Sequence, residues 1–215
     1  MVNKLIVFEG IDGCGKTTLI NKLKKSLINK GHKVKVFQGL GSSSIGKEIR
    51  NLFLYQIKTS PKSKYFLSFA NMIQTQDELI MPALLSGFIV IVDRWYDSTL
   101  AYQSNANYID YEDEITSKII SRFLIKPALT FYLDIDPQNS LQRKQTQPNH
   151  KLDIIEQKPL KYFENVRQNY LNQHKYCNNP NCKHQNCNSF LINATNSQQG
   201  NLEQIIQTLI TKKIL

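Results

Sequence analysis

The stretch FEGIDGCGKTT, residues 8–18, limits the fold of this chain more than any other. Gly10, Gly15, Lys16 and Thr17 match the pattern G-x-x-x-x-G-K-[ST], with an apolar run before it and a helical pattern after it. Glycines let several backbone N–H groups turn toward one anion, and the start of the next helix adds the positive end of its dipole. The stretch therefore predicts a phosphate-binding loop between a buried strand and a helix.

Three side chains of this loop indicate what it binds. Lys16 is placed to reach the β and γ phosphates of a nucleoside triphosphate, and Thr17 offers a hydroxyl group to Mg²⁺. We expect ATP with Mg²⁺. Asp12 would repel the triphosphate if it faced it, so we expect this carboxylate to face the molecule that accepts the phosphate.

Five short apolar runs alternate with helical patterns along the chain. We expect strands at residues 4–8, 33–37, 88–92, 128–134 and 189–194. Apolar runs without alternation are typical of parallel strands that helices cover on both faces. The predicted fold is therefore α/β, a five-stranded parallel sheet flanked by helices and joined by right-handed crossovers, in one domain that spans residues 1–215.

Three helices have clear signals. Apolar residues at helical spacing run from Leu19 to Ile28, and Gly31 supplies a stop. A second apolar face lies within 160–171, with Pro159 expected in the first turn. A final helix is expected from about Leu202 to Ile214.

The net charge of +10 is compatible with a polyanionic partner. Because the lysines and arginines are scattered, with no run of five or more, we favour an ordinary basic surface over nucleic-acid binding. No apolar run reaches the roughly 18 residues that span a bilayer, so we expect no membrane partner. The N-terminal residues follow a buried-strand pattern rather than that of a secretion signal, and the cytoplasm is the expected location.

The segment CNNPNCKHQNC, within the loop expected at about 176–188, holds Cys177, Cys182, His184 and Cys187. Three thiols and a histidine suffice for a tetrahedral metal site. Their C-x4-C-x4-C spacing differs, however, from the C-x2-C pairs of common zinc modules. We favour a polar loop with thiols in a reducing compartment, and a metal site stays open as the alternative.

A second stretch, FIVIVDRWYDSTLAYQ at 88–103, suggests where the acceptor binds. Asp93 ends an apolar strand, and ligands bind at the carboxyl ends of strands in open α/β sheets. We expect Asp93 to hold Mg²⁺ directly or through water. Arg94 has the planar fork that suits a second phosphate. A strand-end ion pair is the structural alternative for both residues.

The two stretches together resemble the thymidylate kinase family, P-loop enzymes that phosphorylate dTMP with ATP. The segment LDIIEQKPLKYFENVRQNYL is similar to the family's lid and next helix, and INATNSQQGNLEQI to its last strand and the loop beside adenine. The resemblance covers nearly all of the chain apart from the cysteine-containing loop. It implies a P-loop kinase fold with a small lid at about 143–156, formation of dTDP for deoxynucleotide synthesis, and a homodimer.

The resemblance also implies roles for individual residues. The ATP-binding set is Gly10, Gly13, Cys14, Gly15, Lys16, Thr17 and Thr18. The acceptor set is Asp12, Arg50, Phe69, Met72, Asp93, Arg94, Thr99, Tyr102, Gln103, Asp153 and Glu156, in which Phe69 would stack on the base. Lys16, Arg94 and Arg143 are the expected catalytic residues, and Thr17 and Asp93 the expected metal ligands.

The chain departs from the family's pattern at three places. Met72 stands where the family usually has an arginine that reads the thymine edge. Residues 38–43, QGLGSS, replace a segment that reads REPGGT in many bacterial relatives. The lid positions of other arginines hold Gln145, Gln147 and Ile154, so Arg143, Lys144 and Lys151 are the remaining cations, and we expect Arg143 to serve the transferring phosphate.

These departures leave alternatives. The acceptor is dTMP, another deoxynucleoside monophosphate or a deoxynucleoside, and Arg50 and Arg94 favour one that already carries a phosphate. A degenerate nucleotide-binding paralogue with little activity is a further alternative, which the arginine-poor lid favours. The residues that argue against it are the intact Lys16, Thr17, Asp93 and Arg94. A nucleic-acid ATPase is disfavoured by the scattered charge and by the length of the chain.

Overall fold

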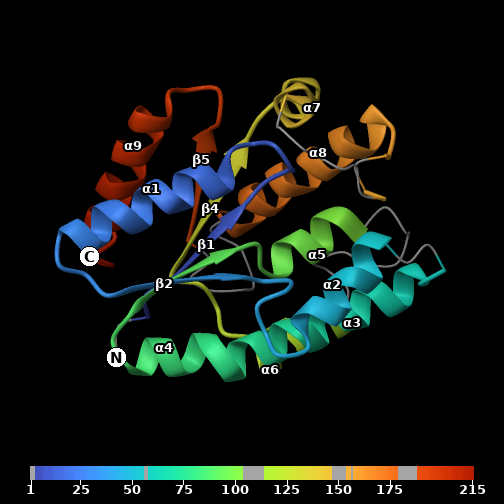
Figure 1. Ribbon diagram of the computed structural model, residues 1–215, viewed down its shortest axis with the longest axis horizontal. Helices are drawn as coiled ribbons and strands as arrows, with labels where there is room; N and C mark the ends of the chain where they lie inside the picture. Colours follow the sequence, from blue (N-terminus) through green and yellow to red (C-terminus); the bar gives the residue numbers. More distant parts are fainter. Residues whose placement is uncertain (1–2, 56–57, 104–113, 147–153, 156, 179–187) are drawn as a thin grey trace.

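The computed structural model describes residues 3–55, 58–103, 114–146, 154–155, 157–178 and 188–215. Five parallel strands form one sheet with helices on both faces (Figure 1). The strands are β1 (Leu5–Glu9), β2 (Val34–Gln38), β3 (Ile89–Asp93), β4 (Leu129–Asp134) and β5 (Ser189–Asn193), in the spatial order β2-β3-β1-β4-β5. The five predicted strands are confirmed, each within one residue at either end.

Both faces of the central strand are buried. Leu5 and Val7 of β1 pack into the cluster that contains Trp95, whereas Ile6 and Phe8 pack into the other cluster. Helices α1 (Lys16–Asn29) and α9 (Gln198–Thr211) cover the face of Ile6 and Phe8 (Figure 1). The consecutive helices α3 (Pro61–Thr75), η1 (Gln76–Ile80) and α4 (Met81–Leu85) cover the other face.

The remaining helices are α2 (Gly46–Tyr55), α5 (Tyr96–Gln103), α6 (Glu114–Phe123), α7 (Pro137–Gln145) and α8 (Leu160–Cys177). Of these, α8 packs against β4 and β5, and the others lie near the carboxyl ends of the strands or beside α3. Helix α5 begins three residues after β3 and packs between α3 and α8. The loops that follow β1 and β3 therefore lie side by side at the same edge of the sheet.

Prolines and caps explain where several helices begin and bend. The single π-helical turn η1 precedes Pro82, which lacks the N–H that an α-helix would use there. Pro159 precedes α8 as its N-cap, so the prediction that it lies in the first turn is wrong by one position. Helix α9 begins earlier than predicted because Ser197 accepts a hydrogen bond from the Gly200 N–H, and it ends at Thr211.

Some predictions fall outside the described residues. Most of the predicted lid, 147–153 and 156, belongs to this group, as do Cys182, His184 and Cys187. The alternative of a metal site in the cysteine-containing loop therefore stays a prediction. Among the helices that the structure describes, none is long and apolar enough to cross a membrane.

Candidate active site

The loop between β1 and α1 has the backbone that phosphate binding requires. Gly10, Gly13 and Gly15 have φ angles of 140°, 81° and 96°, a region that side chains with a Cβ rarely enter. Gly15 is the N-cap of α1, and no side chain caps this helix end. The first N–H groups of α1 and the positive end of its dipole therefore point at the loop.

Lys16 folds back over this loop. Its Nζ donates hydrogen bonds to the carbonyl groups of Gly10 (2.9 Å) and Ile11 (3.1 Å), and it lies 3.6 Å from Cys14 Sγ. The side chain is buried and lines a cavity of about 370 Å³. A fixed positive charge at the wall of such a cavity suits the binding of phosphate groups.

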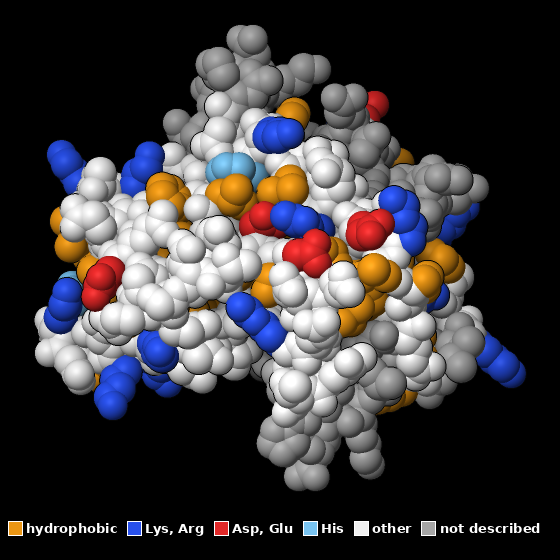
Figure 2. Space-filling model, turned by 90° about the horizontal axis from the view of Figure 1, so that it is seen from above, with side chains coloured by type: hydrophobic (Ala, Val, Ile, Leu, Met, Phe, Trp, Pro, Cys, Tyr) orange, Lys and Arg blue, Asp and Glu red, His pale blue; other side chains and the backbone are white. Residues whose placement is uncertain are grey.

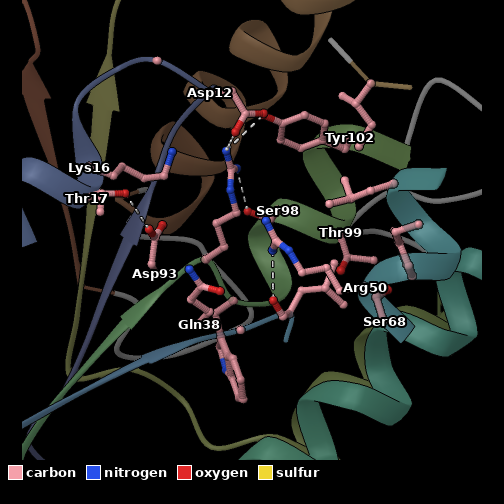
Figure 3. Close-up of a pocket in the computed structure, with 18 of the residues that line it drawn as sticks. Asp12, Lys16, Thr17, Gln38, Arg50, Ser68, Asp93, Ser98, Thr99 and Tyr102 are labelled. Carbon is pink, nitrogen blue, oxygen red and sulfur yellow. Dashed lines mark hydrogen bonds and ion pairs between the residues drawn. The ribbon is translucent and has the colours of Figure 1, made fainter. Parts of the chain in front are cut away.

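Two oxygen groups face each other beside Lys16. Thr17 Oγ1 lies 3.4 Å from Asp93 Oδ2, at the carboxyl end of β3 (Figure 3). The other carboxylate oxygen, Asp93 Oδ1, is buried and has no hydrogen-bond partner within the described part of the chain. A hydroxyl group and a carboxylate with an unsatisfied oxygen are the kind of ligands that Mg²⁺ takes, so the residues fit this ion.

An ion pair joins the loop to the start of α5. Arg94 Nη2 lies 2.9 Å from Asp12 Oδ1, and the Tyr102 hydroxyl group donates to Asp12 Oδ2 at 2.9 Å (Figure 3). Burial opposes the ionisation of Asp12, but Arg94, Lys16 and Lys144 outweigh it and hold the pKa of Asp12 well below its ordinary value. Asp12 is therefore a carboxylate at neutral pH.

A buried carboxyl group lies directly behind Arg94. Glu9, the last residue of β1, is fully buried. Its Oε1 accepts hydrogen bonds from the backbone N–H groups of Trp95 (2.7 Å) and Ser98 (3.3 Å). Burial raises the pKa of Glu9 to about 8, and the negative charge of Asp97 adds to this effect, although Ser98 and Arg94 counteract it.

The far side of the cavity is formed by α2, α3 and α5. Ser68, Met72 and Thr99 line it, and Arg50 reaches it from α2 with Nη1 donating to the Leu40 carbonyl group at 3.1 Å. The cavity therefore runs from the phosphate-binding loop, past Asp12 and Arg94, to a mixed apolar and polar end. Cationic side chains therefore lie at two places along it, Lys16 beside the loop and Arg94 farther in.

Comparison with known proteins assigns this arrangement to a family. The family model described as thymidylate kinase matches residues 8–205. The chain belongs to the thymidylate kinase family. It is 38% identical over 175 residues to a thymidylate kinase of Chlorobium limicola, with 78% of this chain and 80% of that protein covered.

Relatives from other bacteria belong to the same family. Identity to a thymidylate kinase of Chlamydia felis is 38% over 170 residues, covering 77% of this chain and 81% of the relative. Identity to a thymidylate kinase of Thermoanaerobacter sp. is 33% over 172 residues, covering 80% of this chain and 83% of the relative. The resemblance drawn from the two sequence stretches is confirmed, and so is the fold of a P-loop kinase.

The structure brings most of the predicted residues to one cavity. The residues that line it are Asp12, Gly13, Gly15, Lys16, Thr17, Thr18, Arg50, Met72, Asp93, Arg94, Thr99 and Tyr102. Gly10 and Cys14 belong to the loop but are not among the described lining residues. Lys16 donates a hydrogen bond to the Gly10 carbonyl group, and Cys14 is buried in the core. The roles of these residues in the thymidylate kinase reaction stay predictions.

Three predicted residues lie elsewhere. Phe69 is buried against Tyr65, with ring centroids 4.9 Å apart, and is absent from the described lining of the cavity. Gln103, at the end of α5, is also absent from it, and its Oε1 is buried without a described partner. Arg143 donates to the Ala194 carbonyl group at 3.1 Å, beside the loop after β5, while its neighbour Lys144 lines the cavity. Asp153 and Glu156 lie outside the described residues.

Sequence reasoning overlooked Glu9 and Tyr170 as site residues, and it named Lys144 only as one of the cations that remain near the lid. The signal for Glu9 was available, because a charged residue at the end of a buried strand is as unusual there as at Asp93. Tyr170 belongs to the apolar face of α8 by spacing, and only the structure shows its hydroxyl group 3.0 Å from Arg94 Nη1. Lys144 and Arg143 are adjacent, so only the orientation of α7 distinguishes them.

Proposed function

We propose that this chain phosphorylates dTMP to dTDP with ATP. The observation that carries the proposal is that one cavity joins the loop and Lys16 at one end to Asp12 and Arg94 at its middle. Two phosphate sites in one cavity suit transfer between two phosphorylated molecules rather than transfer to water. Arg94 also favours a monophosphate over an unphosphorylated nucleoside as acceptor.

The reaction needs no covalent intermediate with the protein. A phosphate oxygen of dTMP attacks the γ-phosphorus of ATP, the bond from that phosphorus to the bridging oxygen breaks, and ADP leaves with the electron pair. Lys16 neutralises charge on the β and γ phosphates, and Arg94 holds the attacking phosphate in line. Thr17 and Asp93 would hold Mg²⁺, which supplies further neutralisation of phosphate charge when it is bound.

The direct experiment measures ADP release with ATP and each common nucleoside monophosphate in turn. The proposal expects dTMP to give the highest kcat/KM. The variant Lys16→Ala should lose turnover while its melting temperature without ligand stays near that of the original protein. Turnover with ATP alone at the same rate, or full activity of Lys16→Ala, would contradict the proposal.

We also propose that the protein is a homodimer and that it acts in the cytoplasm. Phe66 of α3 and Ile115 and Phe123 of α6 are 57%, 59% and 51% exposed. The two helices adjoin, since the hydroxyl groups of Tyr65 and Thr116 lie 2.7 Å apart. Apolar side chains on neighbouring helices suit the face of a second copy.

Sedimentation tests the dimer. Phe66→Glu should produce monomers, because it puts a charge into the proposed interface. The matched control is Leu85→Glu, at a side chain that is 63% exposed on α4. It should leave the association state as it is. A monomeric original protein, or equal effects of both changes, would refute the dimer without touching the proposed reaction.

A further inference from the structure

The turn that carries Arg94 has an unusual backbone. Arg94 has a φ of 70°, in the left-handed region that residues other than glycine rarely adopt. Such a conformation persists where surrounding contacts fix it. The Arg94 N–H donates to the Phe8 carbonyl group at 2.9 Å. The N–H groups of Trp95 and Ser98 both donate to Glu9, and that of Ser98 also donates to the Trp95 carbonyl group at 3.2 Å. One buried carboxyl group therefore anchors the two sides of the turn.

The same carboxyl group is linked to the guanidinium group of Arg94. Arg94 Nη1 donates to the hydroxyl groups of Ser98 (3.3 Å) and Tyr170 (3.0 Å). Both hydroxyl groups also hydrogen-bond to Glu9 Oε2, the Tyr170 group at 3.2 Å. They lie 2.8 Å from each other. The guanidinium group is thus fixed from behind through two bridging hydroxyl groups, while its Nη2 faces Asp12.

From this geometry we propose that Glu9 is a positioning residue that aims Arg94 at the phosphate of the acceptor. It acts through the backbone of Trp95 and Ser98 and through the hydroxyl groups of Ser98 and Tyr170. The proposal rests on the proposed function, because it assigns the acceptor phosphate to Arg94. Glu9 itself does not line the cavity as described, so its effect on the acceptor must pass through these neighbours.

The surroundings of Glu9 favour a neutral acid at neutral pH. Burial and the charge of Asp97 raise the pKa of Glu9, while Arg94 and Ser98 lower it less. A neutral acid offers an acceptor oxygen to the two N–H groups and carries its proton on the oxygen that the Ser98 and Tyr170 hydroxyl groups approach. Glutamine has the same arrangement of acceptor and donor, whereas methionine has a similar shape and neither.

The fluorescence of Trp95 reads acceptor binding without turnover. Trp95 is the single tryptophan of the chain and lines the cavity. Its backbone N–H donates a hydrogen bond to Glu9. We expect Glu9→Met to raise the Kd and the KM for dTMP by about tenfold or more, with the KM for ATP changed by less than about twofold. Glu9→Gln should recover most of this loss, with a rise of no more than about threefold.

A matched pair of tyrosines keeps the test decisive if Glu9→Met does not fold. Tyr170 and Tyr132 are both buried, and the hydroxyl group of each donates to a buried carboxyl group, that of Tyr132 to Asp97 at 2.7 Å. Of these two tyrosines, only Tyr170 also has a described contact with Arg94. Tyr170→Phe should therefore raise the Kd for dTMP by about threefold or more, and Tyr132→Phe by less than about twofold.

The outcomes separate the two proposals. If folded Glu9→Met or Tyr170→Phe binds dTMP as the original protein does, the positioning role is wrong. Equal loss for dTMP and ATP, or equal loss in Tyr170→Phe and Tyr132→Phe, would show a merely structural role and also overturn it. Failure of the original protein to bind or phosphorylate dTMP would instead refute the proposed function.

Discussion

Arg94 holds its position through several partners at once. It pairs with Asp12, its guanidinium group lies 5.1 Å from the centre of the Tyr102 ring, and its other donors meet Ser98 and Tyr170. The side chain of Arg94 is only 21% exposed. A guanidinium group fixed in this way keeps its positive charge at one defined place in the cavity, so little conformational entropy is lost when an acceptor phosphate binds beside it. At the scale of the residue, the site is organised before the acceptor arrives.

The first prediction removes this group. Arg94→Ala should raise the KM for dTMP and lower kcat, with a loss in kcat/KM of about 10- to 100-fold, because a hydrogen bond to a charged group contributes about 1.5–3 kcal/mol. Steady-state kinetics measure it, with the KM for ATP as the internal control. Arg94→Lys should recover only part, since it keeps the charge and loses the fork. An unchanged kcat/KM for dTMP would mean that Arg94 serves only the ion pair with Asp12.

The second prediction concerns base choice. Met72 is 3% exposed and lines the cavity, where the family usually has a hydrogen-bonding arginine. An apolar contact separates similar substrates by only about 10- to 200-fold. We therefore expect dUMP or another deoxynucleotide to reach within about 100-fold of dTMP in kcat/KM.

Two substitutions examine this position. Met72→Arg should sharpen the preference for dTMP, because the new donors would bond a thymine carbonyl group. Met72→Leu is the matched control, since it keeps an apolar wall of similar volume and should leave the preference as it is. Strict use of dTMP by the original protein, together with no effect of Met72→Arg, would show that other residues read the base.

At the scale of the element, the sheet was more predictable than the helices around the acceptor. Strands β1, β3 and β4 are buried on both faces, so their sequences are continuous apolar runs that end in Glu9, Asp93 and Asp134. The glycine pattern likewise predicts the positions of Lys16 and Thr17 in the loop, because the motif fixes their spacing from Gly10 and Gly15. Helix α5 has a weak helical pattern, because it buries the polar side chains of Asp97 and Thr99 together with apolar ones.

The orientation of α7 is the clearest example of what spacing does not supply. Asp136 caps this helix by accepting from the Gln138 N–H, and Ser140 bonds to the Asp12 carbonyl group. These contacts turn Lys144 toward the cavity and Arg143 toward Ala194. Either residue satisfies the requirement for a cation near the lid, so the sequence did not distinguish them.

The third prediction follows from this orientation. Lys144→Ala should lower kcat by about tenfold or more with little change in either KM, because its charge acts near Asp12 and the transferring phosphate. Arg143→Ala should instead raise the KM for ATP, since it lies beside the loop after β5. Rate measurements under saturating and limiting ATP compare the two variants. A larger fall in kcat for Arg143→Ala would restore the assignment made from the sequence.

At the scale of the whole molecule, the lysines and arginines are scattered along the sequence, and the net charge is +10. Lysine and arginine side chains lie among acidic and apolar ones on the face seen in Figure 2, and no continuous basic strip crosses the described part of that face. Two titratable groups near Arg94 have shifted pKa values. Glu9 has a raised pKa and Asp12 a lowered one, so they act in different ranges of pH.

The final prediction uses this separation. Burial and the charge of Asp97 raise the pKa of Glu9 from 4.5 to about 8, although the Ser98 hydrogen bond and the charge of Arg94 lower this pKa. Between these values the unfolded chain has lost the proton and the folded protein keeps it, so the free energy of unfolding decreases as pH rises. Glu9→Gln has no proton to lose. Its stability relative to the original protein should therefore increase from about pH 5 to about pH 8.

Urea unfolding of both proteins at several pH values in this window measures the difference. Taking the difference cancels groups common to both, such as His174, whose pKa burial lowers and whose own effect has the opposite sign. Asp12 does not interfere, because its lowered pKa confines its effect to more acidic solutions. A constant difference across the window would mean that Glu9 ionises at its ordinary pKa in the folded protein, and that Asp97 and burial do not hold its proton.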